Sequence, residues 1–274
     1  MLKVYGNLNR CSTVFSSIFK KYSLVLNVEN SMQKLNPVFI LVNPQMAENI
    51  GAAARAMLNF GFLNLRLVRP RENHLSDRAL AMAAGAGRVL DKAQVFENIA
   101  DACKDLNEVL ATSARDRYKY KDVIDPIMGC DTIFQSCISG FKVGILFGGE
   151  RAGLSNEDLF LAKKLIRIPS NPIFSSLNLA QSVLLISYQL SVCSLKKNTK
   201  ISHNNVPISK ANYEEMQAFA TRLETELDKK NFFYPEGKKK RMKTRLRKLI
   251  FGLELNKEDV KIFHGVLKAL IKKN

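Results

Sequence analysis

The chain has 274 residues, of which 46% are hydrophobic, and this composition excludes disordered and fibrous proteins. No stretch approaches the roughly 18 uninterrupted apolar residues that a membrane-spanning helix needs, so we expect a soluble, cytoplasmic protein. The net charge of +17 is unevenly distributed. Residues 35–195 hold 17 basic and 15 acidic side chains, whereas residues 196–274 hold 20 and 9. An anionic partner, either nucleic acid or an anionic membrane, is consistent with this charge.

The first 34 residues lack the apolar core of a secretory signal, and their serine-rich, acid-poor composition also fits a transit peptide. We expect residues 1–34 to form a poorly ordered N-terminal extension.

From residue 37 onward, strand-like and helix-like patterns alternate, which predicts an α/β fold with a mainly parallel sheet and helices on both faces. Ser76 is the expected N-cap of one helix. The region between residues 115 and 141 is interpreted as a loop. The predicted strands are 37–43, 63–70, 108–114, 142–150 and 165–169, and the predicted helices are 47–61, 76–87, 95–106, 155–164 and 178–195, with a short apolar segment at 88–91.

Apolar periodicity is lost at residues 196–207, which predicts a linker between a domain at 35–195 and a small all-helical extension at 208–274. Three helices are expected in the extension, at 209–228, 238–251 and 257–272. The second of them is strongly basic, and its cations form either a solvated helix face or, as we favour, an RNA-binding surface. The expected RNA-binding residues there are Lys238, Lys239, Lys240, Arg241, Lys243, Arg245 and Arg247, followed by Lys248.

Five cysteines (Cys11, Cys103, Cys130, Cys137 and Cys193) lie without CxxC spacing beside only three histidines. This pattern supports neither a disulfide framework nor a zinc site, so no metal is expected and the thiols are interpreted as buried and inert.

Parallel sheets bind ligands beyond the carboxyl ends of their strands, and three loops in such positions are unusual. The first contains Asn43, Asn49 and Arg55, the second is FGGERAGLSNED at 147–158, and the third is NPIFSSLNLAQSV at 171–183. The glycines of the second loop form either a plain turn or a close backbone approach to a flat ligand. No Rossmann fingerprint, P-loop or nucleophile elbow is present, so a bound cofactor is expected to carry the chemistry.

Together, NIGAAARAMLNFG, GILFGGERAGLSNED and IPSNPIFSSLNLAQSV resemble the three ordered motifs of the SpoU/TrmH branch of SPOUT RNA methyltransferases. The resemblance covers about residues 37–194. LATSARDR at 110–117 and the segment 227–267 are similar to the middle motif and the helical extension of the TrmJ subfamily. This resemblance implies a SPOUT-type sheet with a C-terminal trefoil knot, an exception to the rule against knotted chains. It also implies a homodimer, to which the long helix from Leu179 contributes.

The resemblance further implies S-adenosylmethionine as cofactor and methylation of the ribose 2′-hydroxyl of the pyrimidine at nucleotide 32 in the tRNA anticodon loop. An rRNA ribose methyltransferase and a non-catalytic RNA-binding protein are the alternatives. Ser175 or Ser176 could instead, or in addition, serve as a helix N-cap. The residues expected to bind the cofactor are Thr112, Ser113, Gly148, Gly149, Ile168, Ser176, Leu177 and Asn178.

By the same resemblance, Arg55 is the catalytic arginine. We expect it to stabilise the developing alkoxide, because a guanidinium is a poor proton acceptor. Asn49 is expected to orient the target ribose or the helix start. Glu150 is expected to position either the arginine or a loop across the site by hydrogen bonding. Arg115 and Arg117 are expected to contact RNA, and a solvated loop charge is the alternative for Arg117.

Overall fold

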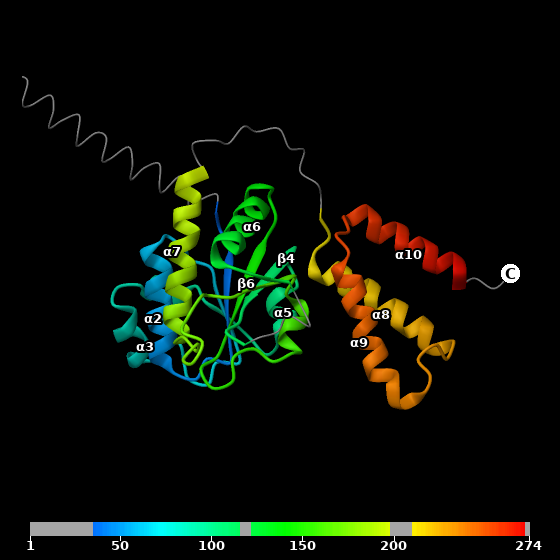
Figure 1. The fold of residues 1–274 in the computed structure, drawn as a ribbon, viewed down its shortest axis with the longest axis horizontal. Helices are drawn as coiled ribbons and strands as arrows, with labels where there is room; N and C mark the ends of the chain where they lie inside the picture. The colour runs from blue at the N-terminus through cyan, green and yellow to red at the C-terminus, as the bar shows by residue number, and fades with distance from the viewer. Residues whose placement is uncertain (1–34, 116–121, 198–209, 272–274) are drawn as a thin grey trace, which may run out of the picture.

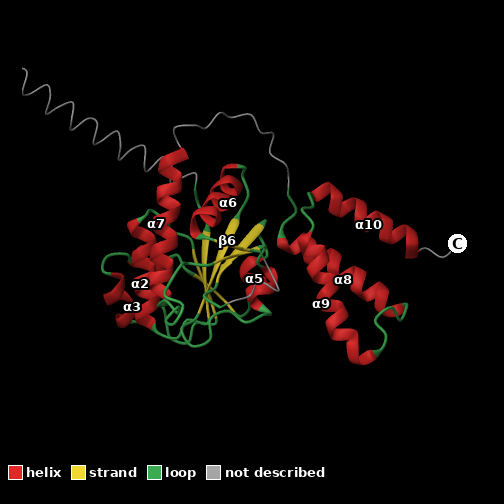
Figure 2. Ribbon diagram, in the orientation of Figure 1, coloured by secondary structure: helices red, strands yellow, loops and turns green. Residues whose placement is uncertain are grey.

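The computed structural model describes residues 35–115, 122–197 and 210–271. Seven strands form one sheet in the order β3-β2-β1-β6-β4-β7-β5, and every neighbouring pair is parallel. Figures 1 and 2 show the sheet at the centre of the larger part of the molecule. The predicted parallel α/β sheet is thereby confirmed. The strands are β1 (Val38–Val42), β2 (Leu65–Val68), β3 (Gln94–Phe96), β4 (Glu108–Thr112), β5 (Val123–Ile124), β6 (Val143–Gly148) and β7 (Lys164–Ile166).

Helices cover both faces of the sheet, because successive strand residues point to opposite sides and both sides are apolar. Phe39 and Leu41 of β1 pack with the helices of one face, while Ile40 and Val42 belong to the core of the other. The first face is covered by α2 (Ala47–Asn59), α3 (Asp77–Ala83), α4 (Gly87–Asp91), α6 (Pro126–Ile138) and α7 (Leu179–Lys197). The second is covered by α5 (Ile99–Cys103) and the 3₁₀ helix η1 (Asp158–Leu161).

The α6 helix corrects the interpretation of residues 115–141 as a loop. The Asp125 side chain accepts the N–H of Met128 as an N-cap, and Pro126 occupies the first turn, where its missing N–H costs nothing. Gly129 then allows close packing against Ile166 of β7. Apolar residues interrupted by Gly, Asp and Gln hid this helix from periodicity alone.

Two further predicted helices are shorter than expected. Residues 94–96 pair with β2 as β3, so the helix predicted at 95–106 is confined to α5, which Asn98 caps. The helix predicted at 155–164 is only η1, because Lys164 already belongs to β7. Ser155 and Asp158 exchange the reciprocal hydrogen bonds of a helix start, so the sequence signal was real while the helix ended within one turn.

Three helices form the C-terminal extension: α8 (Tyr213–Lys229), α9 (Glu236–Gly252) and α10 (Lys257–Ile271). Their own small core contains Met216, Phe219 and Ile250. The extension is anchored to the sheet domain by backbone bonds, in which the N–H groups of Tyr213 and Glu214 donate to the carbonyls of Leu106 and Lys104 at 2.9 and 3.1 Å. These bonds fix the position of the start of α8 relative to the sheet domain.

An ion-pair cluster adds to this anchor. Glu108, which is buried at the start of β4, accepts from Ser136 at 2.5 Å and pairs with Lys163 at 3.1 Å, and Lys163 also pairs with Glu254 of the extension. The pKa of Glu254 is lowered chiefly by its hydrogen bond to Lys163.

Among the described helices, none combines the length and apolar composition that crossing a membrane requires. The predicted extension at 1–34 and, apart from its first two residues, the predicted linker at 196–207 lie outside the described residues. The trefoil knot stays a prediction.

Candidate active site

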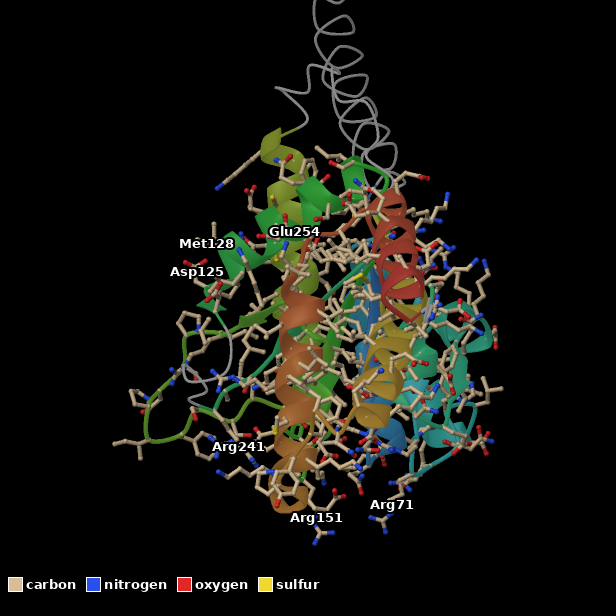
Figure 3. All side chains as sticks on the ribbon, turned by 90° about the vertical axis from the view of Figure 1, so that its right-hand side faces the viewer. Arg71, Asp125, Met128, Arg151, Arg241 and Glu254 are labelled. Carbon is tan, nitrogen blue, oxygen red and sulfur yellow. The ribbon has the colours of Figure 1, made fainter. Side chains whose placement is uncertain are left out.

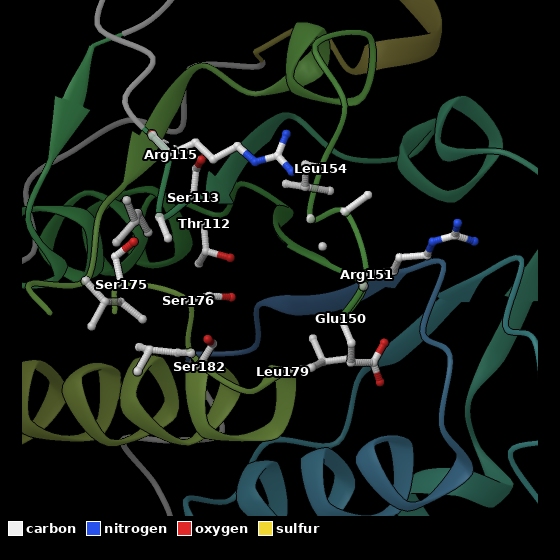
Figure 4. A pocket seen from close by; sticks show the side chains of 18 residues that line it. Thr112, Ser113, Arg115, Glu150, Arg151, Leu154, Ser175, Ser176, Leu179 and Ser182 are labelled. Atoms are coloured by element: carbon white, nitrogen blue, oxygen red, sulfur yellow. Dashed lines mark hydrogen bonds between the residues drawn. The ribbon is translucent and has the colours of Figure 1, made fainter. Parts of the chain in front are cut away.

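A pocket of about 350 Å³ lies at the carboxyl ends of β4, β6 and β7, where the loops after these strands meet the start of α7. Figure 4 shows Thr112, Ser113, Ser176 and Ser182 around its interior. Seven of the eight residues expected to bind the cofactor line it: Thr112, Ser113, Gly148, Gly149, Ile168, Ser176 and Leu177. The predicted cofactor-binding set does not include Ala114, Arg151, Ala152, Gly153, Leu154, Ile166, Ser175, Leu179 and Ser182, which also line the pocket. Seven of these nine lie in the second and third motif loops, whereas Ala114 follows β4 and Ile166 belongs to β7.

The pocket floor depends on glycine at the end of β6. A Cβ on Gly149 would overlap the carbonyl oxygen of Asn43 and would lie 2.8 Å from its carbonyl carbon and 3.0 Å from the Val42 oxygen. A Cβ on Gly148 would meet the backbone of Gly153, which has a φ of +63°. The backbone therefore approaches closely on both sides of this turn, as expected where glycine is required and not merely tolerated.

Asn43, at the end of β1, has a left-handed φ of +52°. The Arg69 Nε donates to its Oδ1 at 2.9 Å, and the Gln45 side-chain amide donates to its carbonyl at 2.9 Å. These bonds hold a conformation that non-glycine residues seldom adopt, next to the pocket floor.

A hydrogen-bond network joins the three motif loops. The Asn178 Nδ2 donates to Asn49 Oδ1 at 2.9 Å, and the Asn49 Nδ2 donates to Glu150 Oε1 at 2.6 Å. The other carboxylate oxygen, Glu150 Oε2, accepts the backbone N–H of Gln45 at 2.8 Å. Asn49 is buried, and both its side-chain oxygen and its side-chain nitrogen have a hydrogen-bond partner in the network, as a buried amide requires. Glu150 thus ties the β6 loop to the start of α2.

Asn178 does not line the pocket. Its Oδ1 accepts the N–H groups of Ala180 and Gln181 at 2.8 and 3.3 Å, so it caps α7 while its amide reaches Asn49. Neither Ser175 nor Ser176 makes this cap, and the interpretation of one of them as N-cap is wrong. Both serines line the pocket instead.

Arg55 lies on an exposed position of α2 and is not among the residues that line the pocket. Within residues 35–115, 122–197 and 210–271, its guanidinium makes no hydrogen bond or ion pair. Of the three catalytic candidates, Asn49 and Glu150 are hydrogen-bonded to each other, whereas Arg55 is bonded to neither. Arg115 lines the pocket, and Arg117 lies outside the described residues.

The basic run of α9 divides into two faces. Lys239 and Lys243 pair with Asp228 of α8 at 3.0 and 2.8 Å, and Arg247 grips the buried Glu224 with two hydrogen bonds of 2.6 and 2.7 Å. The hydrogen bonds from Lys243 and Lys239 lower the pKa of Asp228, and the bond to Glu224 raises the pKa of Arg247. The cations on the exposed face are Lys238, Lys240, Arg241 and Arg245.

Cys103, Cys130 and Cys193 are buried, and Cys137 is half-buried. Burial raises the pKa of Cys103 and of Cys137 to about 12, so these thiols stay protonated and unreactive near neutral pH. Over the described ranges, no group of three or more His, Cys, Asp or Glu side chains could hold a metal ion. The prediction of buried thiols is confirmed for Cys103, Cys130 and Cys193, whereas Cys137 is half-buried and Cys11 lies outside the described residues.

Comparison with known proteins identifies the family. The model of the SpoU rRNA Methylase family matches residues 36–188. The tRNA (cytidine/uridine/adenosine-2′-O-)-methyltransferase TrmJ of Pseudomonas aeruginosa is 35% identical over 235 residues, which cover 83% of this chain and 91% of that protein. The TrmJ of Photorhabdus laumondii is 31% identical, over 85% of this chain and 95% of that one.

Among solved structures, the crystal structure of TrmJ from Z. mobilis ZM4 superposes with a TM-score of 0.76 at 42% identity, covering 86% of this chain and 99% of that chain. The likeness therefore extends beyond the sheet domain into the C-terminal helices. With the parallel sheet, the glycine-floored pocket and the network between its three loops, this match shows that the chain belongs to the SpoU methylase family.

Proposed function

We propose that this protein methylates a ribose 2′-hydroxyl of tRNA with S-adenosylmethionine, at the pyrimidine of nucleotide 32 in the anticodon loop. The observation that carries the proposal is the Asn178–Asn49–Glu150 network, which joins all three motif loops at the rim of the pocket. Support for tRNA comes from the relatives, which are named as tRNA 2′-O-methyltransferases and match over most of this chain. Cytoplasmic localisation is part of the same proposal.

The pocket suits the proposed cofactor. Ile166, Ile168 and Leu177 offer apolar contacts to an adenine ring, and the glycines at the end of β6 leave the backbone accessible to its edge. Thr112 and Ser176 add hydroxyl groups to the lining of the same pocket (Figure 4). A bound sulfonium would supply an electrophilic methyl group, so the protein needs no nucleophilic side chain of its own.

The chain's own groups would then align the ribose and manage charge. Asn49 is held rigidly by Asn178 and Glu150 at the start of α2, so its position is fixed before RNA arrives. A guanidinium stays protonated, so Arg55 acts as phosphate anchor and stabiliser of the 2′-oxyanion and does not remove the proton. The hydroxyl proton passes to an RNA phosphate or to water.

A homodimer is the second part of the proposal. Leu184, Leu185 and Tyr188 of α7 are 40%, 41% and 53% exposed, forming an apolar surface on the helix that packs against α2. Because Arg55 is exposed on α2 and does not line its own pocket, we infer that pairing two copies through this surface brings Arg55 of one protomer toward the pocket of the other.

Replacing Leu185 with Glu should shift the protein from dimer to monomer, because a charge in the centre of an apolar interface loses its hydration. Light scattering coupled to size-exclusion chromatography measures the mass. Lys196→Glu, which changes charge at the exposed end of the same helix, is the matched control and should remain dimeric. A monomeric wild-type protein at micromolar concentration would contradict the dimer proposal.

The exposed face of α9 (Lys238, Lys240, Arg241 and Arg245) is the proposed RNA-binding surface of the extension. Figure 3 shows Arg241 at the same end of the molecule as Arg151 and Arg71 of the sheet domain, whereas Asp125 and Met128 lie toward the other end. Exposed cations near the carboxyl ends of the strands and on α9 can therefore follow one RNA backbone.

Arg241→Ala with Arg245→Ala should weaken tRNA binding and reduce the slope of log affinity against log salt by about two, roughly one per lost phosphate contact. The melting temperature should not change, because both side chains are exposed. Arg247→Ala is the contrasting variant. It leaves the buried Glu224 carboxylate unpaired, so the free energy of unfolding of the extension should fall by about 3 kcal/mol or more. An unchanged salt slope in the double variant would exclude this face from the interface.

The substrate class is tested by incubating the protein with methyl-labelled S-adenosylmethionine and either unmodified tRNA transcripts or ribosomal RNA. Label in tRNA alone is expected. Label in ribosomal RNA alone would favour the rRNA alternative, and cofactor binding without transfer to either RNA would favour a non-catalytic RNA-binding protein.

A further inference from the structure

A second cavity, of about 600 Å³, lies between the sheet domain and the extension, and we name it the interdomain cleft. One wall comes from the start of α5 and from residues 156–161, and the opposite wall comes from Tyr213 of α8 and from residues of α9. Figure 1 shows α5 facing α8 and α9 across this boundary. The volume is within the range of sites that hold a small organic ligand or a nucleotide.

Successive parts of one chain segment line the cofactor pocket and the interdomain cleft. After β6, Gly149–Leu154 line the pocket, and Asn156–Leu161, which include η1, line the cleft. Arg69 makes a second connection, because it lines the cleft while its Nε bonds the side chain of Asn43, whose backbone touches the pocket floor at Gly149. An RNA whose ribose is held at the pocket therefore has its neighbouring nucleotides within reach of the cleft.

The lining of the cleft combines aromatic, apolar and cationic groups. Phe160 and Tyr213 contribute rings, and Ile99 and Leu159 contribute apolar side chains. The Tyr213 ring is fixed by stacking on Phe251, with centroids 5.1 Å apart and an interplanar angle of 22°. Burial raises the pKa of Tyr213 to about 12, so its phenol is neutral at physiological pH and does not repel a phosphate.

Some charged side chains of the cleft are already bonded within the protein. Arg247 donates to Glu224, and Asp158 accepts the N–H of Ser155. Arg69 is exposed, and its only bond among the described residues uses Nε, which leaves its two Nη groups for an anion. Glu157, also in the lining, disfavours a phosphate on its own side and so directs the anion toward Arg69.

We propose that the interdomain cleft binds an unstacked nucleotide of the substrate RNA that neighbours the methylated one, with its base against Phe160 and Tyr213 and its phosphate at Arg69. The proposal rests on the proposed function for the identity of the RNA. Unpaired loop nucleotides can be splayed out and stacked on aromatic side chains, which is the usual way in which proteins bind single-stranded RNA. The cleft would thereby fix which nucleotide of a loop reaches the pocket.

The test introduces a large side chain into the cleft, from α5 in one variant and from α9 in the other. Ala100→Trp and Thr244→Trp place an indole at exposed lining positions of α5 and α9, and Ala218→Trp on the exposed side of α8 is the matched control. Because one stacked base is lost, the Kd for an unmodified tRNA transcript should rise about tenfold in both cleft variants. The Kd for S-adenosylmethionine and the melting temperature should stay at the wild-type values.

Photocrosslinking uses the wild-type protein, so its result does not depend on whether a variant folds. A transcript with 4-thiouridine placed next to the target nucleotide is irradiated with wild-type protein, and the attached peptide is identified by mass spectrometry. Crosslinks to residues 156–161 or 244–248 are expected. Wild-type tRNA affinity in both Trp variants, or crosslinks confined to other peptides, would overturn the proposal. Failure of the wild-type protein to methylate any tRNA would overturn the proposed function instead, since these binding measurements need no turnover.

Discussion

Replacing Arg55 with Ala is expected to lower the rate of methyl transfer by about 10²–10³-fold, the usual loss when one stabiliser of a developing oxyanion is removed. The Kd for S-adenosylmethionine should stay unchanged, because Arg55 does not line the cofactor pocket. The melting temperature should also be preserved, because the side chain is exposed and makes no hydrogen bond or ion pair within the part of the chain that the structure describes. Single-turnover kinetics, isothermal titration and thermal denaturation measure the three quantities.

Arg55→Lys separates charge from geometry. It keeps the positive charge but loses the planar fork that can hold a phosphate and the 2′-oxygen together, so its rate should fall between those of wild type and Arg55→Ala. Wild-type turnover by Arg55→Ala would remove Arg55 from the mechanism.

Mixing subunits shows which pocket Arg55 serves. In a mixed dimer, one chain carries Arg55→Ala with an intact cofactor pocket, and the other carries an intact Arg55 with a defective pocket. If each arginine acts on the partner's pocket, the intact pocket receives the intact Arg55 and each mixed dimer has one complete site. Activity restored well above that of either variant alone is therefore expected, whereas an arginine that serves its own pocket would leave every mixed dimer without a complete site.

Replacing Gly149 with Ala has the second large expected effect. The added Cβ would overlap the carbonyl of Asn43 and approach the Val42 oxygen at 3.0 Å, and both are backbone atoms at the end of a central strand that cannot rotate away. We expect the affinity for S-adenosylmethionine to fall at least tenfold as the loop moves. The free energy of unfolding should fall by about 1–3 kcal/mol, the typical cost of overpacking.

Gly237→Ala is the matched control for this change. Gly237 lies in the first turn of α9, and a Cβ there would have no atom within 4 Å, so neither cofactor binding nor stability should suffer. Denaturant unfolding and isothermal titration of both variants make the comparison. Equal cofactor affinity in Gly149→Ala and wild type would mean that the glycine turn does not form the cofactor site.

Much of the sheet domain could be predicted because its strands are continuous apolar runs and its loops carry distinctive motifs. The run from Val143 to Gly148 is buried over its first five residues in the centre of the sheet, as its composition predicted. Ser76 caps α3 as expected. The pocket was predictable because parallel strands bring their carboxyl ends to one edge, so three loops distant in sequence converge there.

Other features depend on tertiary contacts that sequence patterns do not contain. Lys239, Lys243 and Arg247 resemble their neighbours in the basic run, and only the position of α8 shows that they neutralise Asp228 and Glu224. The role of Asn178 was likewise hidden, since a side chain that caps α7 and bonds Asn49 looks in sequence like any polar pocket residue. Expected RNA contacts at Lys239, Lys243 and Arg247 stay predictions that must compete with these ion pairs.

The central claim is most directly tested by locating the methyl group on the RNA. The protein is incubated with S-adenosylmethionine and an unmodified tRNA transcript, and the product is digested and mapped by mass spectrometry, with a transcript carrying 2′-deoxyribose at nucleotide 32 as control. A 2′-O-methylated pyrimidine at nucleotide 32, absent from the deoxyribose control, is the predicted result. Methylation on a base, or on a ribose elsewhere in the transcript with nucleotide 32 unmodified, would contradict the account.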